Sequence, residues 1–231
     1  MSISVIIPTL NEAEGIVPLL KEVQERASGL VSEIIVADGG SCDSTAKLAR
    51  GAGAEVIRCT KSGRAAQMNQ GAGAASGDIL YFLHADTIPP KSFDRLIQHA
   101  VDDGAGSGCF QLRFSSSHPA LRFYGWCTKF KSTLLRFGDQ SLFVKSDLFH
   151  KTGGFDESLV VMEDQEMVRS LKQLSSFRLL DEHVVTSARR YEKNGVYKLQ
   201  LIFFLILILY YGGAQQDALV HLYKSMIKTG R

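Results

Sequence analysis

The sequence lacks a strong excess of charge, and this absence limits the partners that the chain can have. Its 26 Lys and Arg residues nearly balance its 24 Asp and Glu residues, which leaves a formal net charge of +2. Proteins that bind nucleic acid usually present a strongly basic face. We therefore expect no nucleic-acid partner, and each local cluster of basic residues has to be interpreted on its own.

Cysteine pairs with metal-ligand spacing are also absent. The four cysteines, Cys42, Cys59, Cys109 and Cys127, lie far apart, and no C-x-x-C pair occurs. This pattern favours free thiols in a reducing compartment over a zinc site. The N-terminus begins with a strand-like run at residues 3–7 and shows no basic region followed by an apolar region and a cleavage site. These features favour a cytoplasmic location.

An apolar run long enough to span a bilayer, about 20 residues, is not found either. The most apolar segment, residues 199–211, reads LQLIFFLILILYY. Three interpretations stay open: a buried core helix, an interface in a homodimer, or a helix lying peripherally in the inner face of the membrane. Basic residues favour the membrane alternative, since they suit anionic headgroups. They occur in the basic and aromatic stretch 122–136 and at Lys224, Lys228 and Arg231.

What the sequence does contain is an alternation of strand-like and helix-like segments across its first half. With 231 residues, of which 45% are apolar and 22% charged, the chain fits one α/β domain. We expect strands at residues 4–8, 33–37, 55–58 and 79–83, and helices that begin at 11–14 or cover 43–50 and 64–75. This order predicts a mostly parallel sheet with helices on both faces.

The second half is less regular. The patterns there predict strands at 107–114 and 141–144, a helix at 163–174, and two further helices on either side of Gly212-Gly213. Internal repeats and interdomain linkers are absent from the sequence. We therefore expect a single domain over residues 1–231.

Polar residues follow three of the expected strands, where ligands of open α/β sheets bind. They are Thr9, Asn11 and Glu12 after the first strand, Asp38 and Ser41 after the second, and His84 and Asp86 after the fourth. Asp38 and Asp86 could share a nucleoside diphosphate and its Mg²⁺ or Mn²⁺, because these ions prefer oxygen ligands. Alternatively, Asp38 stabilises the glycine turn that follows it and Asp86 caps a helix. Because carboxylates occur at the ends of two strands, we favour the first interpretation, a site for a nucleoside diphosphate and its metal.

Other polar residues have two interpretations each. Arg189 and Arg190 suit a diphosphate clamp, but a double arginine is also common on a solvated surface. Glu163 and Asp164 suit either a helix cap or a general base. His84 suits a metal ligand or a packed side chain. The glycine patterns at 51–53, 71–76 and 104–108 do not follow the strand, glycine turn and helix order of a dinucleotide site.

Taken in order, these segments resemble the family 2 glycosyltransferases. The matching positions are residues 4–12, the uridine-binding segment 36–45, then Gly63, Arg64, Asn69, Gly71, Ala75, Gly77 and Asp78, then residues 84–86, 153–156 and 163–164. The resemblance covers roughly residues 2–191 and implies an α/β fold of the GT-A type. It implies nucleotide-binding roles for Pro8, Thr9, Asn11, Glu12, Asp38, Ser41, Arg64, Asn69, His84, Ala85, Asp86, Arg189 and Arg190.

A narrower resemblance rests on four short motifs. His84-Ala85-Asp86 stands where the family has D-x-D, and it occurs together with 138–140, 162–164 and 187–191. These motifs are similar to those of a bacterial subgroup sometimes linked to arsenosugar biosynthesis. In the family the second Asp of D-x-D is the usual metal contact. The resemblance therefore implies Asp86 as a ligand of a divalent cation, Mn²⁺ or Mg²⁺, with His84 as a second candidate.

The family resemblance also implies an activity. A sugar moves from a nucleoside-diphosphate sugar, with a UDP donor favoured over a GDP donor, to the hydroxyl of an unidentified acceptor with inversion. Asp164 is our candidate base, with Glu163 second. The domain would divide into a nucleotide-sugar-binding half at 1–106, an acceptor-side half at 107–191 and a helical appendage at 192–231.

Two other classes remain as alternatives. A nucleotidyltransferase normally has a glycine-rich loop with a basic residue after its first strand, where this chain has the acidic Glu12. A non-catalytic module that binds nucleotide sugars is hinted at by His84 alone. Turnover of a donor in the presence of an acceptor would separate an enzyme from a binding module.

Overall fold

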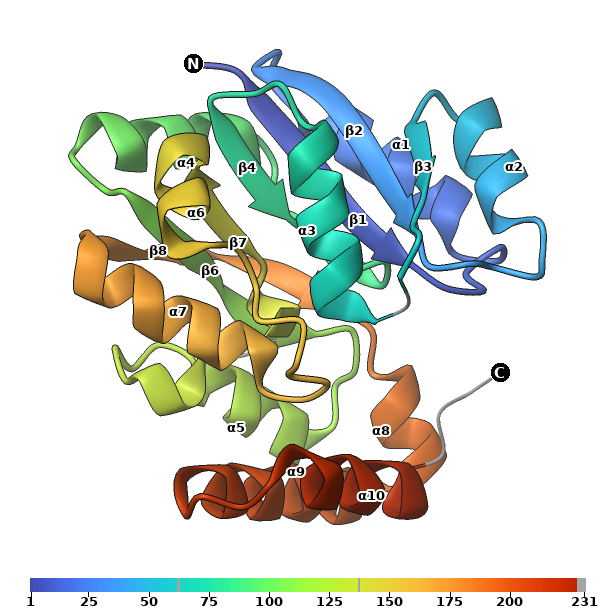
Figure 1. Cartoon of the computed structure of the whole chain (residues 1–231), viewed down its shortest axis with the longest axis vertical. Helices are drawn as coiled ribbons and strands as arrows, with labels where there is room; N and C mark the ends of the chain where they lie inside the picture. Colours follow the sequence, from blue (N-terminus) through green and yellow to red (C-terminus); the bar gives the residue numbers. More distant parts are fainter. Residues whose placement is uncertain (62, 137, 228–231) are drawn as a thin grey trace.

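The protein is described by a computed structural model that covers residues 1–61, 63–136 and 138–227. Lys228 and Arg231, which we expected beside the apolar run, lie outside these residues. The described chain folds around one curled sheet of eight strands in the order β3-β2-β1-β4-β7-β6-β8-β5 (Figure 1). The strands are β1 (Ile3–Thr9), β2 (Val31–Asp38), β3 (Glu55–Arg58), β4 (Ile79–Phe82), β5 (Thr87–Ile88), β6 (Ser107–Phe114), β7 (Leu142–Lys145) and β8 (Phe177–Thr186).

Helices cover both faces of the sheet, and the alternation of side chains along β1 shows why. Val5 and Ile7 join a cluster with helices α1 (Ile16–Arg26) and α4 (Phe93–Asp102). Ile6 points the other way, into a second cluster with α3 (Arg64–Ala74), α6 (Ser146–Thr152) and α7 (Glu163–Leu174). Successive side chains of a strand face opposite sides. All seven residues of β1 are buried, as expected for a central strand covered on both faces.

The expected parallel arrangement is confirmed for β1 to β4, and the second half makes the sheet mixed. Strand β7 runs antiparallel to both β4 and β6, and β5 runs antiparallel to β8. Strand β6 pairs in parallel with β8, most of which the sequence pattern did not indicate. The short helix α2 (Thr45–Gly51) flanks β2 and β3 at the edge of the sheet. The fold class is the mixed α/β architecture that we expected.

The first helix begins later than the sequence pattern predicts. Residues 13–15 form a turn, and α1 begins at Ile16. Asn11 takes a positive φ of 55°, which excludes it from a right-handed helix. Its N–H donates to Ser41 Oγ at 2.9 Å, so the segment is held against the loop after β2 instead.

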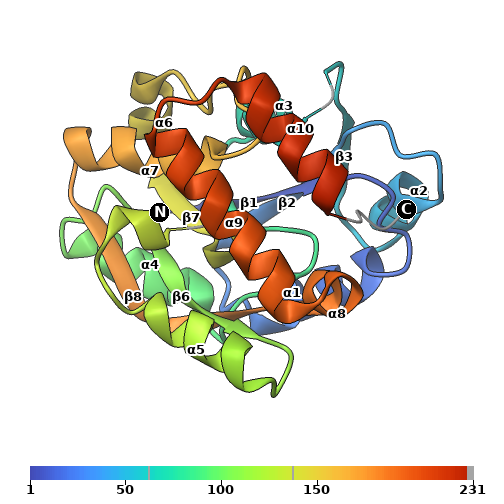
Figure 2. The same cartoon turned by 90° about the horizontal axis from the view of Figure 1, so that it is seen from below.

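A layer of helices closes the end of the molecule to which the carboxyl ends of β1 and β4 point (Figures 1 and 2). Its members are α5 (Pro119–Cys127), α8 (Arg189–Asn194), α9 (Val196–Tyr211) and α10 (Gln216–Met226), with the 3₁₀ turns Thr133–Leu135 and Gly138–Gln140 nearby. On α9, Leu199, Ile202 and Ile206 are buried, but the opposite face is exposed. A fully buried core helix is therefore the wrong interpretation of this run within the single chain. No helix within the described ranges has both the length and the apolar character to cross a membrane.

Candidate active site

The loops after β1 and β2 are pinned together by one buried amide. Gln67 on α3 donates from Nε2 to the carbonyl oxygens of Thr9 and Ala37, both at 2.8 Å. A Cβ on Gly39 would lie 2.8 Å from Gln67 Cδ, so the loop needs glycine to pass this close to the amide. The sequence pattern gave no signal for Gln67, because its partners are backbone groups on two other elements.

Asp38 lies at the centre of this rim. It is 3% exposed, and its Oδ1 accepts from Ser41 Oγ at 2.5 Å. The same Ser41 hydroxyl accepts from the N–H of Asn11, and Asn11 Oδ1 accepts from the N–H of Cys42 at 2.9 Å. Burial, with the charge of Asp38 adding to it, raises the pKa of the nearby Cys59 thiol to about 11. The two loops thus form one ordered edge around a buried carboxylate.

A second group gathers after β4. The His84 ring, with an 11% exposed side chain, places Nδ1 3.1 Å from Asp139 Oδ1. Partial burial would raise the pKa of Asp139, but the hydrogen bond and charge of His84, together with Arg190 and Arg64, lower it to about 2. His84, Asp86, Asp139 and Arg190 line one small cavity. Asp139 belongs to a motif that the sequence singled out, but its contact with His84 was not foreseen.

A third group lies where α3 meets α7. Arg64 forms an ion pair with Glu163 Oε1 at 2.5 Å, and its Nη2 lies 3.5 Å from Asp164 Oδ2. Burial raises the pKa of Glu163, although the charge of Arg64 opposes this. Glu163 is 1% exposed, and its Oε2 has no hydrogen-bond partner among the described residues. Asp164 is 17% exposed, so it is the carboxylate of the pair that a ligand can reach.

Gly138 joins the second and third groups. A Cβ at this position would overlap Asp164 Oδ2 and would lie 2.7 Å from His84 Cε1. The backbone of Gly138 therefore fills the space between these two side chains, and all three residues line a common cavity. His84, Asp86, Glu163, Asp164 and Arg64 consequently belong to one site.

The two arginines that begin α8 differ in their surroundings. Arg190 faces the cavity of Asp86, and its Nη1 lies 3.5 Å from the hydroxyl of Tyr223. Arg189 has a 61% exposed side chain, and its guanidinium reaches Glu12 Oε2 at 3.4 Å. It therefore links the start of α8 to the loop after β1. Pro8 lies in β1 beside Ala37, and Ala85 is partly buried against the core.

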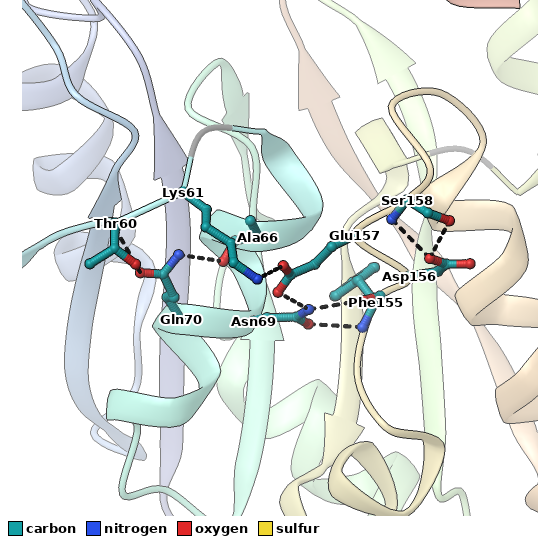
Figure 3. Close-up of polar contacts among 9 residues, drawn as sticks. All are labelled: Thr60, Lys61, Ala66, Asn69, Gln70, Phe155, Asp156, Glu157 and Ser158. Atoms are coloured by element: carbon teal, nitrogen blue, oxygen red, sulfur yellow. Dashed lines mark hydrogen bonds and ion pairs between the residues drawn. The ribbon is translucent and has the colours of Figure 1, made fainter. Parts of the chain in front are cut away.

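Asn69 holds a loop rather than lying in these cavities. Its Nδ2 donates to the carbonyl of Phe155 and its Oδ1 accepts from the N–H of Phe155, both at 2.8 Å (Figure 3). Lys61 adds an ion pair with Glu157 at 2.7 Å. These contacts fasten the loop after α6 to α3. The nucleotide-binding role expected for Asn69 stays a prediction.

The cavity of Asp86 is the candidate place for a divalent cation. In the part of the chain that the structure describes, no group of three His, Cys, Asp or Glu side chains is arranged to hold a metal ion. Mg²⁺ and Mn²⁺ often take one or two protein carboxylates and complete their shell with phosphate oxygens and water. The carboxylates of Asp86 and Asp139 and the ring of His84, around one cavity, provide suitable donor atoms.

Comparison with known families decides where the chain belongs. The model described as Glycosyl transferase family 2 matches residues 4–155. The chain belongs to this family. Family 2 membership agrees with the ordered motifs between β1 and the loop after α6.

The known proteins that are similar to this chain match different fractions of its length. Glucosyl-3-phosphoglycerate synthase of Mycolicibacterium smegmatis is 33% identical over 97 residues, which are 38% of this chain and 32% of that protein. The chain thus spans about a third of the length of that relative. Among solved structures, a TarS fragment of S. aureus in complex with UDP-GlcNAc has a TM-score of 0.68 at 16% identity, covering 81% of this chain and 58% of that one.

A second solved structure extends the likeness over more of the chain. Glucosyl-3-phosphoglycerate synthase of Mycobacterium tuberculosis, in complex with Mn²⁺, UDP and glucosyl-3-phosphoglycerate, has a TM-score of 0.64 at 20% identity. It covers 93% of this chain and 81% of that one. These structures establish that the family 2 chain has the expected GT-A type of fold.

Proposed function

We propose that this chain is an inverting glycosyltransferase that moves a sugar from a nucleoside-diphosphate sugar to an acceptor hydroxyl. The observation that carries the proposal is the division of roles between adjacent carboxylates. Glu163 is buried and paired with Arg64, whereas Asp164 is open to the cavity that His84 lines. A general base has to lie within reach of the proton that it takes. Because it is open to the cavity, Asp164 is our candidate base, and Glu163 is the second candidate.

The donor nucleotide would occupy the rim formed by the loops after β1 and β2. Asp38 would accept hydrogen bonds from the base or ribose, with Thr9, Asn11 and Ser41 shaping the edge around it. Arg64 and Arg190 supply positive charge for the diphosphate, since guanidinium groups match phosphate oxygens. A UDP donor is favoured over a GDP donor, and the TarS and glucosyl-3-phosphoglycerate synthase structures, which contain UDP-GlcNAc and UDP, support this choice.

Asp86 would bind Mn²⁺ or Mg²⁺, with His84 as a second ligand. The Mn²⁺ in the glucosyl-3-phosphoglycerate synthase structure supports this part of the proposal. Asp139 accepts from Nδ1 of His84 when that nitrogen carries the proton, which leaves Nε2 with a free lone pair. A metal-ligating histidine usually donates its other ring N–H to such a carboxylate. A cation bound there supplies positive charge to the leaving diphosphate.

The chain's own groups carry the rest of the displacement. Asp164 takes the proton from the acceptor hydroxyl, and the oxygen forms a bond to the anomeric carbon. The bond from that carbon to the diphosphate oxygen breaks at the same time, and the nucleoside diphosphate departs with the electron pair. Arg190 and Arg64 stabilise the charge that develops on it, and such preorganised charge is usually a large contribution to catalysis.

Donor binding and turnover test this function. Calorimetry should detect UDP in the presence of Mn²⁺, and a donor incubated with extracts of candidate acceptors should release UDP. Binding without turnover for any donor and acceptor would favour the non-catalytic module. Release of pyrophosphate from a nucleoside triphosphate would favour a nucleotidyltransferase.

The subgroup resemblance adds a narrower proposal about the biosynthetic pathway in which the chain acts. Gly138, Asp139 and Asp164, which belong to the subgroup motifs, gather around His84, and this clustering supports a shared specialisation of the site. The chain would then act in arsenosugar biosynthesis. Mass spectrometry of arsenic-containing glycosides in cells that express the wild type or Asp164→Asn tests this. Equal profiles in the two strains would exclude the role.

We also propose a cytoplasmic location at the inner face of a membrane, through the apolar run at residues 199–211. A homodimer in which the same run forms the interface is the alternative. Support comes from the exposed apolar side chains of α9.

A further inference from the structure

Helix α9 carries more exposed large hydrophobic residues than any other described helix. Seven of its large side chains are at least about one-third exposed: Tyr197 (69%), Leu201 (67%), Phe204 (56%), Leu205 (39%), Ile208 (52%), Leu209 (36%) and Tyr211 (48%). Single exposed leucines are normal on protein surfaces, but a contiguous patch marks an interaction site. We call these seven residues the α9 face.

Helical geometry makes the α9 face continuous. Residues three or four positions apart share one side of a helix, and Tyr197, Leu201, Phe204, Ile208 and Tyr211 follow this spacing over the whole element. They form one ridge, with Leu205 and Leu209 beside it. In Figure 2 this helix lies outermost, next to α10.

The only charge on α9 itself is positive. The helix has no Asp or Glu, and its one charged residue, Lys198, is exposed next to Tyr197. The two neighbouring helices add exposed lysines, Lys193 on α8 and Lys224 on α10, and each of them also carries one exposed acidic residue, Glu192 and Asp217. Cations beside an apolar ridge are complementary to the headgroups of anionic lipids. The ridge also begins with Tyr197, whose exposed ring suits the boundary between water and acyl chains.

The inner side of the same helix belongs to the candidate site. Phe203 lines the cavity of His84 and Asp86. Near the C-terminal end of α9, the Tyr210 hydroxyl donates to Glu166 Oε2 at 2.9 Å. Glu166 lies in the first turn of α7, two residues beyond Asp164. Helix α9 is therefore a wall of the site on one side and an uncovered apolar ridge on the other.

We propose that the α9 face docks on the surface of an anionic lipid bilayer, with α9 lying in the plane of the headgroups. The docking follows from the exposed ridge and its basic neighbours alone. If the proposed transferase function also holds, the cavity of Asp86 and Asp164 is held against the membrane. Its acceptor is then an amphiphile of that bilayer.

Vesicle flotation of the full chain tests the docking without any need for activity. The probe is a vesicle of phosphatidylcholine with about one-third phosphatidylglycerol. Leu201→Glu with Leu205→Glu places two carboxylates on the ridge, and it should lower the partition into vesicles by at least about tenfold. Leu174→Glu with Leu48→Glu is the matched control, since these helical leucines are 57% and 37% exposed and lie on α7 and α2. The control should float like the wild type.

Three outcomes would overturn the proposal. They are wild-type protein that stays below the vesicles, a ridge variant that floats unchanged, and a dimer in sedimentation that the ridge variant converts to monomer. Melting curves check that both double variants are folded. A titration with UDP and Mn²⁺ keeps the two hypotheses apart, because unchanged UDP affinity in the ridge variant shows that only docking was lost.

A fluorescent probe then locates the contact. The chain has a single tryptophan, Trp126, so Trp126→Phe with Phe204→Trp puts the emission on the ridge. Vesicles that contain brominated phosphatidylcholine should quench this emission. Flotation without quenching would place the contact elsewhere and would overturn the assignment to the α9 face.

Discussion

Arg64 at the start of α3 and Glu163 at the start of α7 form an ion pair at 2.5 Å, in which Glu163 is buried and Arg64 is partly exposed, although 99 positions separate them. Removing Arg64 would be costly, because it would leave the buried Glu163 carboxylate without its partner. The pair therefore fixes the first turn of α7 against α3. Its neighbour Asp164 keeps one long contact, 3.5 Å, to the same guanidinium and faces the cavity that His84 lines.

Asp164→Asn should abolish most sugar transfer and leave the affinity for UDP nearly intact. An acceptor-side base does not need to touch the nucleotide, and a general base contributes roughly 10²–10⁴ in rate. Turnover and calorimetry with UDP and Mn²⁺ measure the two effects separately. Normal transfer by Asp164→Asn combined with an inactive Glu163→Gln would move the base to the preceding residue.

Asp38→Ala and Asp86→Ala should both weaken the binding of UDP, for different reasons. Loss of the buried Asp38 carboxylate removes hydrogen bonds to base or ribose, which are each worth about 1.5–3 kcal/mol when one partner is charged. Asp86→Ala should instead remove the dependence of affinity on Mn²⁺. Calorimetry with and without Mn²⁺ distinguishes the two. Unchanged affinity in both variants would exclude the donor site described above.

Gly138→Ala should reduce transfer strongly although it adds one methyl group. The new Cβ would displace Asp164 or His84, and small displacements of catalytic groups can cost about 10²-fold in rate. Gly73→Ala is the control, since Gly73 lies on helix α3 and a Cβ added to it would meet no atom within 4 Å. It should retain activity and gain up to about 1 kcal/mol of stability. Equal activity of the two variants would contradict the packing around Gly138.

The free energy of unfolding should fall in acid, because the stabilisation that the ionised Asp139 carboxylate provides is lost there. Its pKa is lowered from 3.8 to about 2, so the folded state binds this proton less readily than the unfolded chain. The resulting stabilisation is present above about pH 4 and is lost as the pH falls towards 2. Denaturant titrations at several pH values should show this loss in the wild type and a weaker one in Asp139→Asn. Parallel acid profiles would argue against the charge contacts with His84, Arg190 and Arg64.

Asn69→Ala should separate two roles for this residue. Loss of the paired hydrogen bonds to Phe155 leaves a backbone N–H and a carbonyl without partners, a cost of about 1–3 kcal/mol for each group that stays buried. The free energy of unfolding should fall while the affinity for UDP stays the same. A fall in affinity at unchanged stability would instead support the nucleotide-binding role predicted from the family resemblance.

The sequence predicted the local elements well where the period of apolar residues was strong. Helix α7 and strand β6 have the predicted bounds, since each shows a continuous pattern over its whole length. Strand β8 was largely missed because Asp181 and Glu182 interrupt its apolar alternation and lie exposed. Most of its residues are only partly buried, so the chain does not need an unbroken apolar run there.

The residues alone pointed to a site where polar side chains follow strands, as at Asp38 and Asp86, and the family resemblance added Arg64. Their binding roles stay predictions. The contacts of Arg64 with Glu163 and of His84 with Asp139 join segments far apart in the chain, and no local period encodes them. Gln67 gave no signal, because an amide on a helix resembles any solvated glutamine until its two carbonyl partners are known.

The pairing of β5 with β8 has a consequence for the order in which the protein is completed during synthesis. Thr87 Oγ1 lies 3.0 Å from Thr186 Oγ1, 99 positions away, and the carbonyl of Asp86 accepts from the N–H of Ser187 at 3.0 Å. The rim around Asp38, in contrast, uses contacts made within the first 67 residues or so of the growing chain. Contacts between distant segments form late. A nascent chain stalled before Ser187 should therefore form the ordered rim around Asp38 but leave the carbonyl of Asp86 without its backbone partner.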